Sequence, residues 1–67
     1  MSEHITETRD DITTTVYLLT TNLWAWYSSK GMLYLDKQSV QAHSQEEAIE
    51  KAFQLAEEQF QMIEEKQ

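Results

Sequence analysis

The sequence predicts a small, single-layer α+β domain with the order helix–β-hairpin–helix. Three patterns favour this fold: apolar residues at helical spacing over residues 44–66, two short strand-like segments within residues 32–43, and a narrow apolar stripe over residues 11–30. A chain of 67 residues is long enough for one domain and too short for two. We therefore expect one domain over residues 1–67 with one hydrophobic core.

The C-terminal helix, expected over residues 44–66, has the clearest pattern. Ser44 and Glu47 form a capping box, in which the serine hydroxyl accepts a hydrogen bond from the Glu47 amide. At 100° per residue, the apolar residues from Ala48 to Ile63 fall within one half of the helical wheel. The other half carries seven glutamates: Glu46, Glu47, Glu50, Glu57, Glu58, Glu64 and Glu65.

A β-hairpin is expected before this helix. Residues 32–35 and 39–43 have strand character, and residues 36–38 between them read as a polar turn. Residues 1–7 are expected to form a disordered leader.

Residues 11–30 carry two conflicting patterns. Their β-branched residues, many of them threonines, favour strands. Their apolar stripe from Ile12 to Tyr27 follows spacings of three and four, which favours a helix that ends with Gly31 in the left-handed conformation. The helix is preferred. The alternative is a three- or four-stranded antiparallel meander plus the C-terminal helix, with residues 28–31 as a hairpin loop.

The composition offers few groups for catalysis. The chain has no cysteine, its histidines are His4 and His43, and no spacing suggests a catalytic triad, a phosphate loop or a zinc motif. We therefore expect a protein that is not an enzyme and that needs no metal or cofactor. The polar N-terminus and the lack of an apolar run of ~18 residues predict a cytoplasmic protein without a membrane partner.

The charge is concentrated in the C-terminal helix. Seven glutamates against two lysines in residues 44–67 supply −5 of the net charge of −7. Such a charge disfavours direct binding to nucleic acid and favours a basic partner. The glutamates at 50, 57 and 64 repeat every seven residues, ~10.5 Å apart along a helix, and could imitate a phosphate backbone. The competing interpretation is a solvated face that keeps the domain soluble.

Two aromatic residues fall outside the apolar stripe expected over residues 11–30. Tyr17 and Trp24 are seven residues apart and would lie side by side on a helix, where they could form an exposed binding patch.

The sequence has two resemblances. Residues 43–53 resemble the strand-to-helix passage of small α+β families such as the HicB-type antitoxins, but the paired early strands and the DNA-binding tail of that family are not visible, and we do not adopt it. In size, acidity and lack of a catalytic set, the whole chain resembles the small acidic inhibitors that phages direct against host defence, the anti-CRISPR proteins in particular.

The anti-CRISPR resemblance implies a stoichiometric inhibitor in the host bacterial cytoplasm, a DNA mimic that blocks the basic DNA-recognition surface of a CRISPR effector complex. The alternative hypothesis is a small interaction or antitoxin-like module that binds partners through aromatic and apolar surface, often as a homodimer. The sequence leaves open whether the chain is a monomer or a homodimer.

Overall fold

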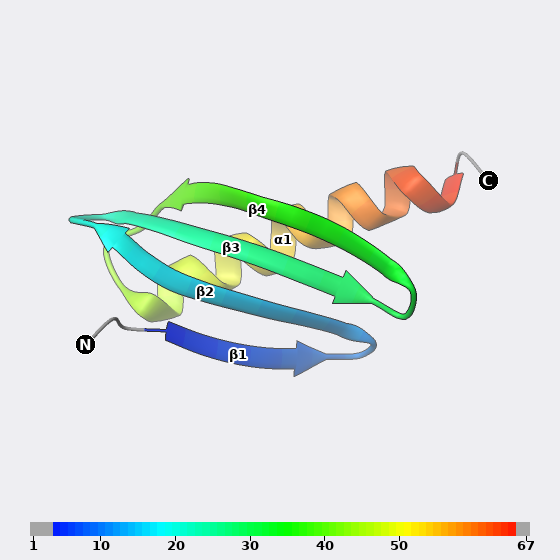
Figure 1. The fold of residues 1–67 in the computed structure, drawn as a ribbon, viewed down its shortest axis with the longest axis horizontal. Helices are drawn as coiled ribbons and strands as arrows, with labels where there is room; N and C mark the ends of the chain where they lie inside the picture. Colours follow the sequence, from blue (N-terminus) through cyan, green and yellow to red (C-terminus); the bar gives the residue numbers. More distant parts are fainter. Residues whose placement is uncertain (1–3, 66–67) are drawn as a thin grey trace.

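The computed structural model describes residues 4–65 and contains one antiparallel sheet and one helix. The elements are β1 (His4–Arg9), β2 (Ile12–Thr20), β3 (Leu23–Lys30), β4 (Leu33–Gln41) and α1 (Gln45–Glu65). The strands pair in the order β1-β2-β3-β4, and α1 crosses one face of the sheet (Figure 1). The α+β class and the meander alternative are confirmed. The preferred helix–β-hairpin–helix order is wrong, and the domain has two layers, a sheet and a helix, in place of one.

Residues 11–30 contain the whole of β2 and β3 instead of a helix. Ile12, Thr14 and Val16 are buried while the residues between them are partly exposed, which is the period of two that a half-covered strand requires. Trp24 and Trp26 on β3 are buried on the same face of the sheet. The apolar stripe at helical spacing was misleading because it left out the polar member of the alternating buried set, Thr14.

Two further expectations need correction. Residues 32–43 lie largely in one strand, β4, which runs through the turn expected at residues 36–38. Asp36 and Lys37 form a β-bulge opposite Tyr27, where the register passes from Ser28↔Leu35 to Trp26↔Gln38. Residues 4–7 of the expected disordered leader belong to β1, which pairs with β2 along its whole length. Residues 1–3 lie outside the described residues.

The turns place backbone residues in the left-handed region, with φ of 57° at Asp10, 61° at Asn22 and 59° at Gly31. Asp10 and Gly31 open two-residue hairpin loops, where mirror-image turns require a positive φ at the first position. The left-handed conformation of Gly31 is therefore confirmed, although it serves a hairpin and not a helix end. Ser28, Ser29 and Lys30 belong to β3 and not to a loop.

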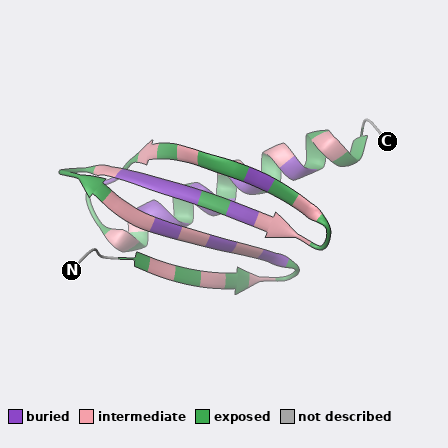
Figure 2. Cartoon of the chain, in the orientation of Figure 1, coloured by how far each residue is buried: buried purple, intermediate pink, exposed green. Residues whose placement is uncertain are grey.

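The core lies between the sheet and α1 (Figure 2). Trp26, Val16 and Phe60 are fully buried, and each such apolar side chain contributes ~1.5–3 kcal/mol of burial free energy. Ala48, Ala52 and Ala56 on α1 are also buried, and their small side chains let the helix approach the strands closely.

The helix is fixed at both ends and along both sides. Ser44 is its N-cap, because the Ser44 hydroxyl accepts a 3.1 Å hydrogen bond from the Glu47 amide as predicted. On the β4 side, the Gln38 and Gln59 amides exchange two hydrogen bonds of 2.8 and 3.0 Å, and Lys51 donates to the Gln41 carbonyl at 2.8 Å. The helix expected over 44–66 is confirmed within the described residues; Lys66 lies outside them.

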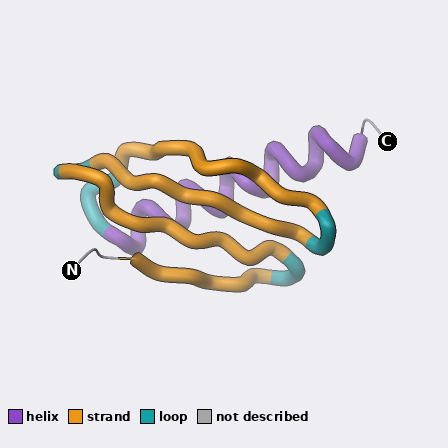
Figure 3. The backbone as a smooth tube through the Cα atoms, viewed as in Figure 1, coloured by secondary structure: helices purple, strands orange, loops and turns teal. Residues whose placement is uncertain are grey.

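The loops gather at the two ends of the sheet (Figure 3). The β1–β2 and β3–β4 turns lie at one end, beneath which the C-terminal half of α1 runs; the β2–β3 turn and the β4–α1 connection lie at the other. In residues 4–65, α1 is too polar to cross a membrane.

Candidate functional site

The seven glutamates predicted as partner-binding residues all lie on α1, and the structure divides them into two groups. Three have ion pairs inside the molecule: Glu50 with Arg9 at 2.6 Å, Glu64 with Lys30 at 2.7 Å, and Glu47 with Lys51 at 3.1 Å. The other four have no ion pair within residues 4–65: Glu46, Glu57, Glu58 and Glu65. The second group is exposed.

Arg9 ties the edge strand β1 to α1. Its guanidinium contacts Glu50 and Glu7 and lies 4.4 Å above the centre of the Phe53 ring, so it bridges a charged and an aromatic surface. The hydrogen bond from Arg9 lowers the pKa of Glu50, and the same bond raises the pKa of Arg9. A hydrogen bond from Lys51 similarly lowers the pKa of Glu47. Glu50 therefore links α1 to β1, and Glu47 is paired within α1.

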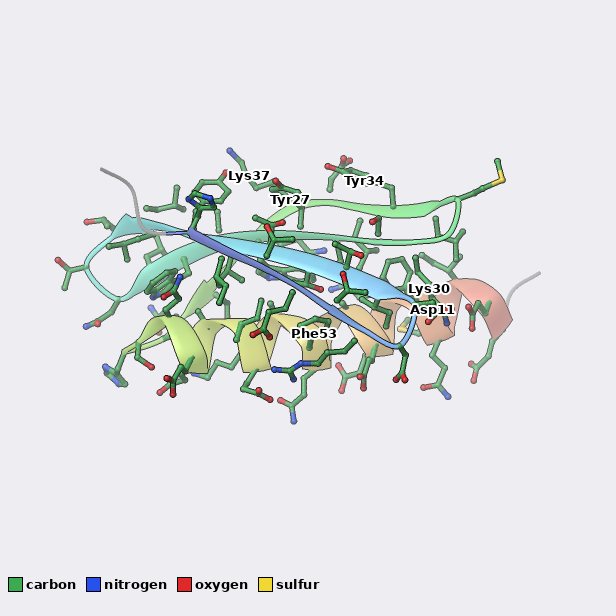
Figure 4. All side chains as sticks on the ribbon, turned by 90° about the horizontal axis from the view of Figure 1, so that it is seen from below. Asp11, Tyr27, Lys30, Tyr34, Lys37 and Phe53 are labelled. Atoms are coloured by element: carbon green, nitrogen blue, oxygen red, sulfur yellow. The ribbon has the colours of Figure 1, made fainter. Side chains whose placement is uncertain are left out.

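Exposed carboxylates stand on the C-terminal half of α1 and in the β1–β2 turn. Lys30 connects them: it is hydrogen-bonded to Glu64, and both Glu64 and Asp11 raise its pKa, with Glu64 the larger cause. Figure 4 shows Asp11 and Lys30 beside this part of the helix. We define the acidic surface by its residues: Asp10, Asp11, Glu57, Glu58, Glu64 and Glu65.

The charges at the C-terminal end of α1 are unfavourable for the stability of the helix. The last turn of α1 contains Glu64 and Glu65 and no basic residue within the described chain. The partial negative charge at a helix C-terminus disfavours carboxylates there. In addition, α1 has a single i,i+4 glutamate–lysine bridge within residues 4–65, Glu47–Lys51, near its other end.

Tyr17 and Trp24 do not form the patch expected of them. Trp24 is 3% exposed, faces the core and donates its indole N–H to the Ala42 carbonyl at 3.2 Å. Tyr17 lies on the other face of the sheet, with the Lys37 ammonium 5.8 Å from the centre of its ring. Residues seven apart share a face on a helix, but here they stand on opposite faces of a hairpin, because Tyr17 pairs with Ala25 and Trp24 with Leu18.

Sequence reasoning missed the aromatic residues that do share an exposed face. Tyr27 and Tyr34 accompany Tyr17 on the uncovered side of the sheet. The signal was the alternation of polar and apolar residues in the strand interpretation of residues 12–30, which the preferred helix interpretation set aside.

His43 lies in a depression of about 480 Å³ at the start of α1, lined also by Trp24, Asn22 and Ser44. A shallower, mainly apolar depression of about 230 Å³ lies between β4 and the end of α1, lined by Leu35, Gln59, Met62 and Ile63. Residues 4–65 contain no cluster of three or more metal-ligating side chains.

Comparisons with protein-family models, with curated proteins and with solved structures find no significant match. The function must therefore be inferred from the chemistry of the surfaces, of which the acidic surface on α1 is the most strongly charged.

Proposed function

We propose that the chain is a non-catalytic binding inhibitor whose acidic helix docks on a basic nucleic-acid-binding surface of a partner protein. The observation that carries the proposal is the set of exposed carboxylates, Glu57, Glu58 and Glu65, that have no ion pair within residues 4–65. Glu65 also stands in the last turn of α1, where the helix dipole disfavours it. An arginine-rich groove would remove that unfavourable charge, because each carboxylate can accept the two-pronged hydrogen bonds of a guanidinium.

The spacing of the carboxylates supports mimicry of a phosphate backbone. Glu57 and Glu64 are seven residues apart on α1, as are Glu58 and Glu65, so each row repeats at ~10.5 Å. Phosphates follow one another at ~3.4 Å along each DNA strand, so the rows match about every third phosphate. Asp10 and Asp11 extend the negative charge beyond the helix.

The partner class follows from the resemblance to small acidic phage inhibitors. We infer that the partner is a complex that must bind DNA through a basic channel, such as a CRISPR effector complex. Binding of this kind is steered by charge, so its rate of association should fall steeply as salt is added.

The test has two stages. Tagged protein is first used to capture partners from a bacterial lysate at low and high salt, with competing DNA as a second eluent. A DNA-binding complex so retained, or a purified CRISPR effector complex, is then titrated with the chain while its binding to target DNA is measured. We expect DNA binding to be lost at stoichiometric amounts of the chain.

Two variants with the same net charge separate the effect of the acidic surface from the effect of total charge. The change Glu57→Gln with Glu58→Gln should weaken inhibition at least tenfold. The change Thr20→Lys with Thr21→Lys, at the exposed end of β2 and in the β2–β3 turn at the far end of the sheet, should alter inhibition little. Equal inhibition by wild type and both variants would show that the acidic surface only solvates the helix.

A further inference from the structure

The sheet has one face that α1 does not cover. Residues that pair across the strands share a face, and the uncovered one contains the sets Thr15↔Tyr27, Tyr17↔Ala25 and Ser29↔Tyr34. Tyr27 is 36% exposed and Tyr34 is 60% exposed. Figure 4 shows Tyr27, Tyr34 and Lys37 on the side of the sheet away from the helix.

This face is nearly uncharged on a strongly acidic molecule. It is built from hydroxyl and aromatic side chains, and two pairs of its threonines are hydrogen-bonded to each other, Thr6 with Thr15 at 2.8 Å and Thr8 with Thr13 at 3.0 Å. Within residues 4–65, the acidic and basic side chains on it are His4 at its edge, and Asp36 and Lys37, which are adjacent in the β4 bulge and opposite in sign. The net charge of −7 therefore lies elsewhere.

The centre of the face is closely packed. Ala25 is 1% exposed although no element covers that side, so its neighbours on the same face enclose its small side chain. Tyrosine offers large contact area at a low cost in conformational entropy, and it is enriched at protein interfaces. The three tyrosines come from three adjacent strands, β2, β3 and β4.

We propose that the uncovered face binds a second copy of the chain, so that two sheets pack face to face in a four-layer homodimer with both helices outside. The distribution of charge favours a second copy as the occupant of this face. A like-charged copy cannot approach the acidic side without repulsion, but across the uncovered face the two α1 helices would stand roughly 30 Å apart, given a sheet spacing of ~10 Å and a helix diameter of ~10 Å. That separation exceeds the ~8 Å Debye length at physiological ionic strength.

The area of the face suffices for a weak dimer. Four strands at ~4.8 Å spacing and about eight residues of ~3.3 Å each give roughly 500 Å² per copy, or ~1,000 Å² in the pair. This total stands at the lower limit for a specific interface, so we expect a dissociation constant in the micromolar range. A domain this small buries a thin core, and dimerisation adds to that core.

The dimer does not depend on the proposed function, but it would serve it. Two acidic surfaces would face away from each other on opposite sides of one assembly. Loss of inhibition in the Glu57 and Glu58 variant leaves the dimer intact, and loss of the dimer leaves each acidic surface intact, so the two proposals fail separately.

The test is sedimentation equilibrium of the full chain over a range of concentrations. We expect wild type to approach twice the 7.9 kDa chain mass at ~100 µM. Tyr34→Lys should raise the dissociation constant at least tenfold, because a twofold interface carries each substitution twice. Met62→Lys is the matched control: Met62 is 57% exposed, similar to Tyr34, but lies on α1, and its substitution should leave the constant within about twofold.

A second variant and a fold check keep the outcome clear. Tyr27→Lys, closer to the centre of the face, should dissociate the dimer further, and circular dichroism should show that all variants keep the wild-type spectrum. A wild type that stays monomeric at ~1 mM would overturn the proposal. A dimer disrupted by Met62→Lys but not by Tyr34→Lys would also overturn it, because the interface would then lie on the helix side.

Discussion

Thr14 and Ser28 show how this core accommodates polar groups. Both are buried on the face of the sheet that contacts α1, and they pair directly across β2 and β3. Their hydroxyls are hydrogen-bonded to each other at 2.5 Å. Each hydroxyl therefore has a partner, whereas the buried Trp26 indole N–H has no hydrogen-bond acceptor within the described residues.

The Thr14–Ser28 pair predicts a loss of stability that comes from a hydroxyl without a hydrogen-bond partner and not from a change in side-chain size. Thr14→Val keeps the shape of the side chain but leaves the Ser28 hydroxyl buried without a partner, so it should lower the free energy of unfolding by ~1–3 kcal/mol. Adding Ser28→Ala removes the orphaned hydroxyl and should recover much of that loss. Urea unfolding of wild type, both single variants and the double variant measures the coupling; costs that simply add would contradict the prediction.

The elements differ in how far local sequence determines them. The Ser44 cap and the amphipathic wheel of α1 are local, and both were predicted correctly. Strands β2 and β3 depend on hydrogen bonds to neighbouring strands, so the strand propensity of their β-branched residues competed with an apolar stripe at helical spacing. The hydrogen bonds that decide in favour of strands come from the pairing of β2 and β3 with each other and with β1 and β4, which the periodicity of a single segment does not show.

The candidate site was likewise predictable only where it depends on local sequence. The identity of the seven α1 glutamates followed from the wheel. The wheel did not show which of them have ion pairs, because the partners of Glu50 and Glu64 are Arg9 and Lys30, on β1 and β3. Trp24 was misplaced for a related reason: its neighbours depend on whether residues 11–30 are read with a period of 3.6 or of two.

The ion pair between β1 and α1 predicts a specific response to acid. Arg9 lowers the pKa of Glu50, so the unfolded chain binds a proton more readily than the folded one. The stabilisation is complete above the unfolded pKa of ~4.3 and is lost as pH falls through the lower folded pKa. Glu50→Gln should lower the Tm near neutral pH and should flatten its decline below about pH 4.

Glu46 provides the control for the acid response. It lies one turn before Glu50 on α1 and has no ion pair within residues 4–65. Glu46→Gln should keep the wild-type decline of Tm in acid to a larger extent than Glu50→Gln. Identical acid profiles for the two variants would show that the Arg9–Glu50 pair contributes nothing to the pH dependence of the fold.

The molecule as a whole has two unlike sides. One side carries the acidic surface on α1 and the β1–β2 turn, and the other is a nearly neutral sheet of hydroxyl and aromatic side chains. The two proposals assign these sides different partners, a basic protein and a second copy. This separation of charge lets a chain with a net charge of −7 both self-associate and attract a cationic groove.

The acidic surface should reduce stability in exchange for binding, and two substitutions with the same charge change test this. Glu65→Lys places a cation in the last turn of α1, where the helix dipole favours it, and should raise the Tm by up to a few degrees. Glu46→Lys makes the same change in the first turn, where the dipole disfavours a cation, and should lower the Tm. Glu65→Lys should also weaken inhibition of the partner, as a trade-off between stability and function requires. If instead both variants raise the Tm equally, relief of net charge explains the effect, and the position of the carboxylates on α1 no longer argues for a partner.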